Sequence, residues 1–333
     1  MGIENIWEDD VFSTYSLTSA IEELPIKFGM VRGSGLFKVE PIPTTVAVLE
    51  KRDGVLGLVP NTPRGGPGVT PVAEKREVRA YPLTHLPEND SVKADDVQNI
   101  RAFGSETQLM QITSLVNNKL QRMKDNLEIT REHLLCGALQ GNILDADGTT
   151  VLANLFTDYG VTREAVDFAL GTSTTDVRGK CLAVKRLVEK ALGGRPLSGV
   201  KAYATDTFFD KLIKHAEVKA AYANWASNEM LRNDPRSGFT FGGIEWVNYD
   251  PYVGTRSFFT DGDANVFPVG TSGVFSEYVG PADYVETVNT MGREYYAKKE
   301  ATKFNKGVDL EAQSNPFPIC NIPLTLVRAY SSD

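Results

Sequence analysis

Two glycine-rich stretches are the first candidates for chemistry, because backbone amides in such loops can cradle a phosphate. They lie at Gly33-Ser34-Gly35 and at 64–68 (RGGPG). Neither is followed by Lys-Ser or Lys-Thr, and neither completes the G-x-G-x-x-G pattern before a helix. The sequence therefore predicts no nucleotide loop and no cofactor.

The acidic stretch Asp145-Ala146-Asp147-Gly148 resembles the opening of a calcium-binding EF-hand loop. Such a loop needs a bidentate Glu at its twelfth position, and Phe156 stands there instead. A turn is therefore the better interpretation of this stretch. No zinc-ligand spacing occurs elsewhere, so we predict no metal site.

His133 and Cys136 have the residue types of a base and a nucleophile, and they lie three residues apart. Both fall in a long predicted helix, and a straight helix is a poor place for an exposed nucleophile with an oxyanion site. Ordinary packing is therefore favoured for both side chains. Since no GxSxG or HExxH motif occurs either, we predict no catalytic residue and a protein that is not an enzyme.

Length, charge and composition exclude several classes of protein. The chain has 333 residues, 41% hydrophobic residues and a formal net charge of −8, which suits about two domains of ~150 residues each. No apolar run approaches the ~18 residues that span a bilayer, and the acidic N-terminus is unlike a signal peptide. Three widely spaced cysteines indicate a reducing cytoplasm rather than a disulfide framework. The net negative charge argues against nucleic-acid binding over the whole surface, because binding phosphates requires clustered Lys and Arg.

The strongest structural signal is a long amphipathic helix over 106–139. At ~1.5 Å per residue it would be about 50 Å long, which suggests a structural spine. Ser105 with Gln108 forms a plausible capping box, and Gly141 suits the stop. The apolar stripe consists of Leu109, Ile112, Val116, Leu120, Met123, Leu127, Leu134 and Ala138. The opposite, polar face consists of Lys119, Arg122, Lys124, Asp125, Glu128, Arg131 and Glu132.

A long two-stranded arm is predicted ahead of this helix. The segment 42–52 is rich in β-branched residues and meets a turn at Asp53-Gly54, and a second extended piece runs over 69–81. The stretch 63–68 (PRGGPG) between them suits neither helix nor regular strand. Such an arm has too little core to be stable alone, so it should rest on a neighbour. The first forty residues show no sustained period, and both an extended arm and an ordinary N-terminal subdomain fit them.

The rest of the chain mixes helices and strands without a repeated βαβ pattern, which predicts the α+β class. A hairpin is predicted over 143–152, with its turn at Asp147-Gly148. The other expected elements are helices at 177–192 and 205–228, strands at 242–247 and 264–269, and a closing strand at 321–330.

This order of elements resembles the coat-protein fold of tailed bacteriophages, the Hong Kong-97 type. The local sequence is closer still to the lambda-type major capsid protein family, phage major capsid protein E. The resemblance spans about 42–330, and it rests on the order and spacing of several short matches. These are 42–45 (IPTT), 50–54 (EKRDG), 63–68 (PRGGPG), 75–79 (KREVR), 92–106 (VKADDVQNIRAFGSE), 137–148, 264–270 and the C-terminal strand.

The resemblance implies a major capsid protein, a structural virion component made late in infection. Copies would self-assemble as hexamers and pentamers into an icosahedral bacteriophage head that encloses double-stranded DNA. The implied parts are an N-terminal arm (1–41), an extended β-arm or E-loop (42–86), a peripheral domain (87–172 and 287–333, with the spine helix at 106–139) and an axial domain (173–286).

The implied partners are further copies of the chain, a separate scaffolding protein, a portal and a decoration protein. The DNA would be enclosed without sequence-specific binding, no membrane would be involved, and assembly would take place in the host cytoplasm. Basic residues of the β-arm would make ion pairs between subunits, although solvated edge charges are an equal alternative. These residues are Lys51, Arg52, Arg64, Lys75, Arg76 and Arg79.

Two other functions stay open at this point. An encapsulin-like nanocompartment subunit of the same fold would need a cargo-binding pocket that the sequence does not advertise. A soluble cytoplasmic enzyme would need an activity from residues that form no recognisable constellation.

Overall fold

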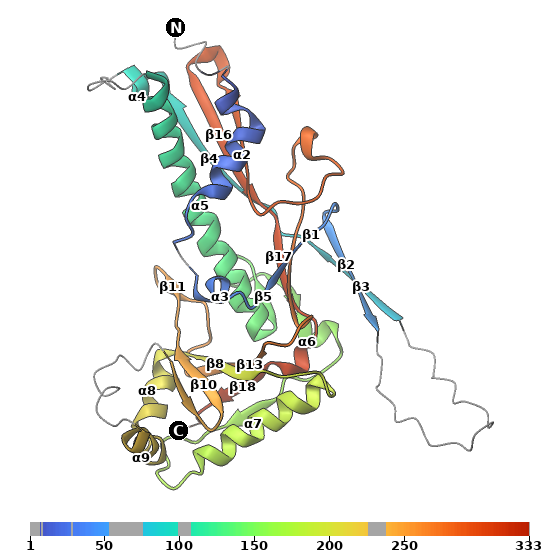
Figure 1. Cartoon of the computed structure of the whole chain (residues 1–333), viewed down its shortest axis with the longest axis vertical. Coiled ribbons are helices and arrows are strands. Elements are labelled where there is room, and N and C mark those ends of the chain that lie inside the picture. The colour runs from blue at the N-terminus through green and yellow to red at the C-terminus, as the bar shows by residue number, and fades with distance from the viewer. Residues whose placement is uncertain are drawn as a thin grey trace, which may run out of the picture.

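The computed structural model describes residues 7, 9–27, 29–52, 76–98, 108–225 and 238–332. Helices and strands are mixed, so the predicted α+β class is confirmed. Figure 1 shows an elongated molecule in which one long helix runs from the upper end down to a sheet at the lower end, while a two-stranded arm projects to one side.

The long helix is α5 (Gln108–Gln140), which confirms the predicted spine. Its 33 residues correspond to about 50 Å of helix. Ile112, Val116 and Leu120 are buried in one hydrophobic core, whereas Leu134 and Leu139 are buried in another. The helix therefore links two cores. The predicted cap residue Ser105 lies outside the described residues.

Gly141 ends α5 with φ +74°, and a Cβ atom there would overlap the ring of Phe156. We expect Gly141→Ala to lower the free energy of unfolding by about 2–4 kcal/mol, because left-handed backbone strain adds to overpacking. The matched control is Gly160→Ala, at φ +61° in open space, which should cost only about 1 kcal/mol. Urea unfolding measures both variants, and equal losses would contradict the predicted clash.

The upper core lies between α5, the helix α2 (Thr14–Glu23) and a three-stranded antiparallel sheet. The order of that sheet is β15 (Tyr296–Ala301), β16 (Gly307–Ser314) and β4 (Leu86–Lys93). The Ser13 hydroxyl caps α2 by accepting from the Ser16 amide. Since Phe12, Leu17 and Ile21 are buried in this core, the described N-terminal residues pack on their own chain, as an N-terminal subdomain would.

The lower core surrounds a six-stranded mixed sheet, covered by α7 (Val177–Leu192), α8 (Asp206–Lys214) and α9 (Ala216–Trp225). α7 and β13 confirm the helix and strand predicted at 177–192 and 264–269. The order of the sheet is β7 (Ala165–Asp167), β18 (Val327–Tyr330), β13 (Asp263–Val269), β8 (Gly199–Ala204), β10 (Ile244–Asn248) and β9 (Phe239–Phe241).

Three predicted elements in this region differ from the structure. The single helix expected at 205–228 is wrong, because the backbone is extended at His215 (ψ 136°) and divides it into α8 and α9. The strand expected at 242–247 starts only at Ile244, since Gly242 and Gly243 form the turn between β9 and β10 with φ of 61° and 76°. The closing strand shortens to β18, because the 3-10 helix η6 (Pro323–Thr325) precedes it.

The C-terminal strand β18 is an interior strand of the six-stranded sheet. It lies between β7 and β13 in the six-stranded sheet, although 287–333 was expected in the peripheral domain. The backbone amide of Phe168 donates to the Tyr330 carbonyl at 2.8 Å and extends this pairing. The sheet therefore takes strands from both sides of the expected boundary.

A third sheet connects the upper and lower parts, and small elements complete the fold. The connecting sheet has the order β1 (Lys38–Pro41), β14 (Phe275–Val279) and β17 (Pro316–Cys320). β5 (Asn142–Leu144) and β6 (Val151–Asn154) confirm the predicted hairpin. The remaining elements are η1 (Asp10–Phe12), α3 (Met30–Gly33), α4 (Ala94–Gln98), α6 (Leu155–Asp158), β11 (Tyr252–Val253), β12 (Arg256–Ser257), η4 (Val285–Thr287), η5 (Lys303–Asn305) and the arm strands β2 (Val46–Arg52) and β3 (Arg76–Pro82).

Candidate functional site: the β-arm and the buried charge cluster

The His133–Cys136 pair is part of the packing of α5. Both side chains are buried, and the Nε2 atom of His133 lies 3.2 Å from the carbonyl oxygen of Asp145. Burial raises the pKa of the Cys136 thiol well above its usual value and lowers the pKa of His133. A thiol that is buried and protonated is a poor nucleophile.

The acidic stretch at 145–148 forms a turn, as its sequence suggested. One carboxylate oxygen of Asp147 accepts from the Thr149 and Thr150 amides, both at 2.8 Å, and the other accepts from the Thr150 hydroxyl at 2.6 Å. These hydrogen bonds lower the pKa of Asp147. The described parts of the chain contain no group of three or more His, Cys, Asp or Glu residues that could hold a metal ion, and no helix among them is long and apolar enough to cross a bilayer.

The β-arm consists of β2 and β3, paired antiparallel from Val46 opposite Pro82 to Arg52 opposite Arg76. One face turns inward at its base, where Ala47 and Tyr81 are buried. On the other face, Val48 and Val78 keep 62% and 63% of their surface exposed. Because side chains alternate along a strand, this outer face presents a short apolar strip that none of the described residues covers.

The inner face anchors the base of the arm to the connecting sheet and to α6. The ring of Tyr81 stacks on Phe317 with centroids 5.2 Å apart, and its hydroxyl donates to Asp158 at 3.2 Å. Burial is the main cause that raises the pKa of Tyr81, and the Asp158 carboxylate adds to it. The arm is therefore fixed at its base and projects from there (Figure 1).

The six basic residues predicted to contact other subunits have different positions. Arg79 contacts its own chain, since its Nε donates to the Asp158 carbonyl at 2.9 Å and its guanidinium lies 4.1 Å from the centroid of the Tyr159 ring. The backbones of Lys51, Arg52 and Arg76 lie in the outer ends of the arm strands, but their side chains are outside the described residues. Arg64 and Lys75 lie outside them altogether. An intersubunit role for this set stays a prediction.

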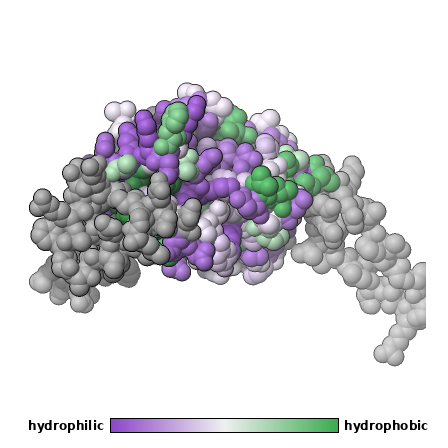
Figure 2. All heavy atoms as spheres, turned by 90° about the horizontal axis from the view of Figure 1, so that it is seen from above, coloured by the Kyte–Doolittle hydropathy of each residue, from purple (hydrophilic) through white to green (hydrophobic). Residues whose placement is uncertain are grey.

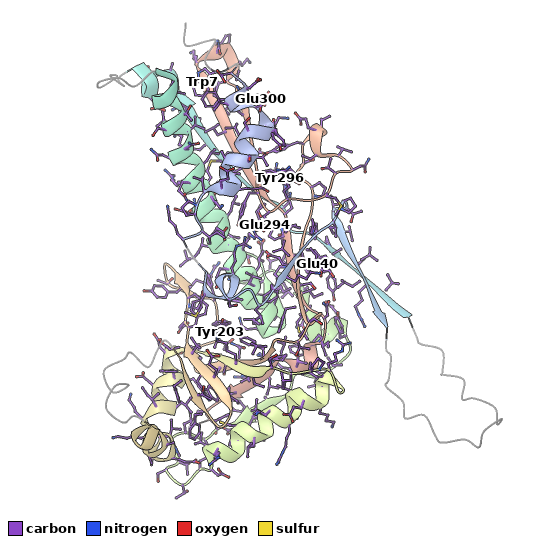
Figure 3. All side chains as sticks on the ribbon, in the orientation of Figure 1. Trp7, Glu40, Tyr203, Glu294, Tyr296 and Glu300 are labelled. Atoms are coloured by element: carbon purple, nitrogen blue, oxygen red, sulfur yellow. The ribbon has the colours of Figure 1, made fainter. Side chains whose placement is uncertain are left out.

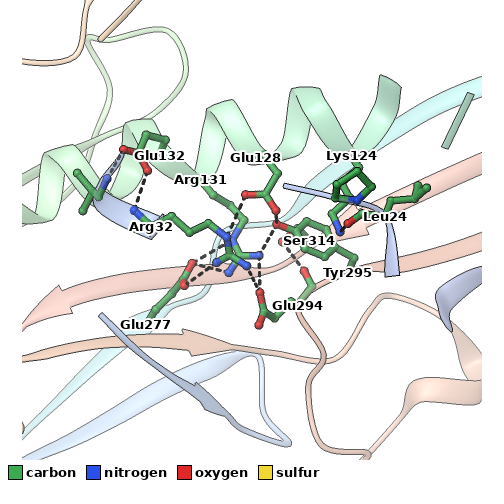
Figure 4. Close-up of polar contacts among 12 residues, drawn as sticks. Leu24, Arg32, Lys124, Glu128, Arg131, Glu132, Glu277, Glu294, Tyr295 and Ser314 are labelled. Carbon is green, nitrogen blue, oxygen red and sulfur yellow. Dashed lines mark hydrogen bonds and ion pairs between the residues drawn. The ribbon is translucent and has the colours of Figure 1, made fainter. Parts of the chain in front are cut away.

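A buried charge cluster lies on α5 between the two cores (Figure 4). We define it as Arg32, Glu128, Arg131, Glu277, Glu294 and Tyr295. The side chain of Arg131 has no exposed surface. Its Nη2 and Nε donate to Glu277 at 2.8 and 3.0 Å, while its Nη1 donates to Glu294 at 3.1 Å and to Tyr295 at 2.6 Å.

Arg32 brings a second guanidinium from α3 into the cluster. Its Nε pairs with Glu128 at 3.0 Å and its Nη1 with Glu277 at 3.4 Å, and its Nη2 also pairs with Glu294. Tyr295 closes the cluster by donating its hydroxyl to Glu128. The cluster thus joins four segments: α3, α5, β14 and the two residues immediately before β15, Glu294 and Tyr295 (Figure 4).

The carboxylates decide the protonation states in the cluster. Burial would lower the pKa of Arg131, but Glu277 and its other anionic neighbours outweigh burial and raise it. Burial would raise the pKa of Glu294, but Arg131 and Arg32 outweigh it and lower it. Each charged form is therefore stabilised by its partners, which is the condition for keeping ions in a protein interior.

Two further charges of α5 hold the N-terminal segment. The ammonium of Lys124 donates to the carbonyls of Ile21, Glu22 and Leu24 at 2.8, 3.1 and 2.7 Å, where α2 ends. The carboxylate of Glu132 accepts from the amide of Val31 at 2.7 Å, where α3 begins. The backbone carbonyls at the end of a helix and the backbone amides at its start have no partner within the helix, so Lys124 and Glu132 supply the missing partners for α2 and α3.

The structural roles of these four charged residues were not predicted from the sequence. Lys124, Glu128, Arg131 and Glu132 were expected on the polar face of the helix, and all four are buried. Their partners lie far away in the chain, so no local period marks them. Although these four charged residues are buried, the described surface seen from above is still mostly hydrophilic, with only separate hydrophobic patches (Figure 2).

Comparisons with known proteins agree over nearly the whole chain. The family model described as phage major capsid protein E matches residues 13–331. The major capsid protein of Salmonella phage Felix O1 is 25% identical over 355 residues, covering 96% of each chain. The major capsid protein of Pseudomonas phage KPP10 is also 25% identical, covering 95% of this chain and 96% of its own.

Solved structures show the same fold. The mature capsid of bacteriophage PhiM1 superimposes with a TM-score of 0.54 at 12% identity, covering 93% of this chain and 89% of that one. The capsid of the cyanophage P-SCSP1u gives a TM-score of 0.52 at 11% identity, covering 93% and 90%. The Hong Kong-97-type coat fold predicted from the sequence is confirmed.

Proposed function

This chain belongs to the phage major capsid protein E family, and on that premise we propose that its copies assemble as hexamers and pentamers into an icosahedral head around double-stranded DNA. The observation that carries this function is the family match over residues 13–331. It makes the chain a self-associating shell protein and a component of the virion.

We propose that the β-arm reaches over a second copy of the chain. Two strands without a core of their own are marginally stable in water. The base of the arm is anchored through Tyr81, whereas Val48 and Val78 on its outer face are exposed. A neighbouring subunit would cover this apolar strip and stabilise the arm.

The division into parts is also a proposal. The peripheral domain would consist of α5 with the three-stranded sheet, and the axial domain would surround the six-stranded sheet. β18 supports a change to the expected boundary, because its pairing with β13 groups it with the axial sheet, and β7 joins the same sheet through β18.

The partners beyond the chain itself are inferred from the family. We expect a separate scaffolding protein, a portal and a decoration protein, with assembly in the host cytoplasm and no catalytic activity. Since η1 and α2 contribute Phe12, Leu17 and Ile21 to the upper core, removal of this segment during maturation would expose that core. A scaffold supplied as a separate protein is consistent with this.

The two alternative functions, a nanocompartment subunit and a soluble enzyme, are not favoured. Both curated relatives reported above are major capsid proteins of phages, which supports a phage head over a nanocompartment. The buried thiols argue against a cysteine enzyme, since burial raises the pKa of Cys181 and of Cys320 to about 12.

Expression of the chain alone tests the proposal. Size exclusion with negative-stain images should show shells, tubes or ring-shaped capsomers, alone or after a scaffolding protein is added. A monomer that persists with the scaffold would contradict the proposal. Arg64→Glu combined with Arg76→Glu should block assembly and leave a folded monomer, and normal shells from this variant would reject the predicted role of the arm charges.

A further inference from the structure

The turn between β15 and β16 has an unusual backbone. Phe304 and Asn305 have φ of 67° and 53°, a left-handed conformation that glycine and asparagine adopt but that is unfavourable for a bulky aromatic residue. Phe304 is nevertheless 81% exposed. Among the described residues, the Phe304 ring is not buried against a core that would compensate for this conformation, so a functional reason should be sought.

The turn is held firmly in spite of its exposure. The Asn305 amide donates to the Thr302 carbonyl at 2.9 Å, and the Thr302 amide donates to the Gly307 carbonyl at 3.0 Å. The Lys306 carbonyl accepts from the Ala94 amide at 2.9 Å, which joins the turn to α4. The backbone that carries Phe304 is therefore held in one conformation, so binding would have to order only the side-chain rotamer of Phe304.

A pocket of about 600 Å³ lies at the opposite end of the same sheet. Leu83, Tyr284 and Val288 give it an apolar lining, and Asn315 and Asp283 add polar groups. Its volume falls in the range of ~300–1,000 Å³ that is typical of binding pockets. Val288 remains 64% exposed, so the apolar lining is open to a partner.

The pocket is out of reach of Phe304 in the same chain. β16 runs from Gly307 beside the turn to Ser314 beside the pocket residue Asn315, and eight residues of strand span about 26 Å. In Figure 3, Glu300 lies near the turn, whereas Tyr296, which packs on Tyr284 of the pocket, lies further down the strand. If the ring of one copy entered the pocket of another copy, the contact between the two copies would be head-to-tail, and head-to-tail contacts build rings and lattices.

Charge supports a second copy as the occupant. The ammonium groups of Lys303 and Lys306 lie 5.8 and 6.0 Å from the centroid of the Phe304 ring. The pocket carries the carboxylate of Asp283. An aromatic residue between two cations thus matches an apolar pocket with an acidic group, and complementary charges favour the correct orientation.

We propose that Phe304 of one subunit inserts into the pocket formed by Leu83, Tyr284 and Val288 of a neighbouring subunit. This contact rests on the proposed shell function and names one of its interfaces. Buried aromatic residues in pockets are frequent hot spots of protein interfaces. The unfavourable backbone at Phe304 is then retained because it aims the ring at the neighbour.

The first test is Phe304→Gly, with Asn305→Gly as the matched control. Both changes suit the positive φ, so neither should lower the melting temperature of the subunit. We expect Phe304→Gly to raise the subunit concentration needed for assembly at least tenfold, while Asn305→Gly assembles like the unchanged chain. Normal assembly of Phe304→Gly would overturn the inference. If the unchanged chain forms no shell even with a scaffold, the proposed function itself fails.

The second test locates the contact directly. Phe304→Cys and Val288→Cys subunits are mixed, assembled and treated with a short bismaleimide. Cys136, Cys181 and Cys320 are buried and should not compete. We expect a covalent dimer from the mixture and none from either variant alone. Shells that give no dimer from the mixture would overturn the assigned pocket.

Discussion

Replacing Arg131 with alanine lowers the free energy of unfolding by about 3–5 kcal/mol, the cost of breaking a fully buried ion pair. Arg131 has no exposed surface, and it donates to Glu277, Glu294 and Tyr295. Without it, Glu277 remains buried with one weaker partner, Arg32 at 3.4 Å. Urea unfolding followed by circular dichroism measures the loss.

The control for Arg131→Ala is Lys214→Ala. Lys214 pairs with Asp210 at 3.1 Å on α8, but both side chains are largely exposed, so this change should cost at most about 0.5 kcal/mol. Arg131→Lys should give an intermediate loss, because an ammonium cannot donate in the fixed fork of a guanidinium. Similar losses for Arg131→Ala and Lys214→Ala would contradict the structural role of the cluster.

The same cluster predicts the acid sensitivity of the fold. Arg131 and Arg32 lower the pKa of Glu294 in the folded protein from its ordinary value of 4.5. A lowered pKa contributes stability above that ordinary value, and the contribution is lost as the pH falls through the folded pKa. Acid titration of the unchanged chain and of Arg131→Ala should therefore show a smaller loss below pH 4.5 in the variant.

Val48→Asp combined with Val78→Asp abolishes shell formation and leaves a folded subunit. Both side chains are more than 60% exposed, so the subunit should keep its stability within about 1 kcal/mol. In the proposed shell, each aspartate would bury a charge without a partner against a neighbouring copy, which is strongly unfavourable. Size exclusion and negative-stain images measure assembly, and circular dichroism measures folding.

The isosteric variant Val48→Thr with Val78→Thr separates shape from charge. Threonine keeps the branched shape and the strand preference of valine, so assembly should be weakened but retained. Normal shells from the aspartate variant would show that the outer face of the β-arm stays in solvent, and the proposed contact of the arm would be wrong.

The sequence predicted correctly those helices and turns that are determined by residues close together in the chain. α7 and the apolar stripe of α5 follow from helical spacing, and the 145–148 turn follows from Asp147 and Gly148. The break at His215 was missed because the helical period continues through it. In the structure the Nδ1 of His215 lies 3.3 Å from the Glu217 amide, where it caps the new helix.

The buried charges could not be predicted, because their burial depends on distant residues. Arg32 meets Glu277 and Glu294, which are 245 and 262 positions away in the chain. An Arg or Glu on a helix is usually at the surface, so one sequence gives no reason to bury Arg131. The six-residue set of arm charges was inferred from resemblance, and the contacts of Arg79 with Asp158 and Tyr159 belong to its own chain.

The position of β18 has a consequence for synthesis on the ribosome. β18 lies inside the six-stranded sheet, between β7 and β13, so the sheet lacks an interior strand until residue 330 has left the ribosome. At roughly 5–20 residues per second, synthesis of the roughly 60 residues from the end of β13 to the end of β18 keeps that gap open for about 3–12 seconds. A product cut short before Val327 cannot complete the sheet. We therefore expect a product truncated before Val327 to fail in shell assembly, because an interior strand of its sheet is absent.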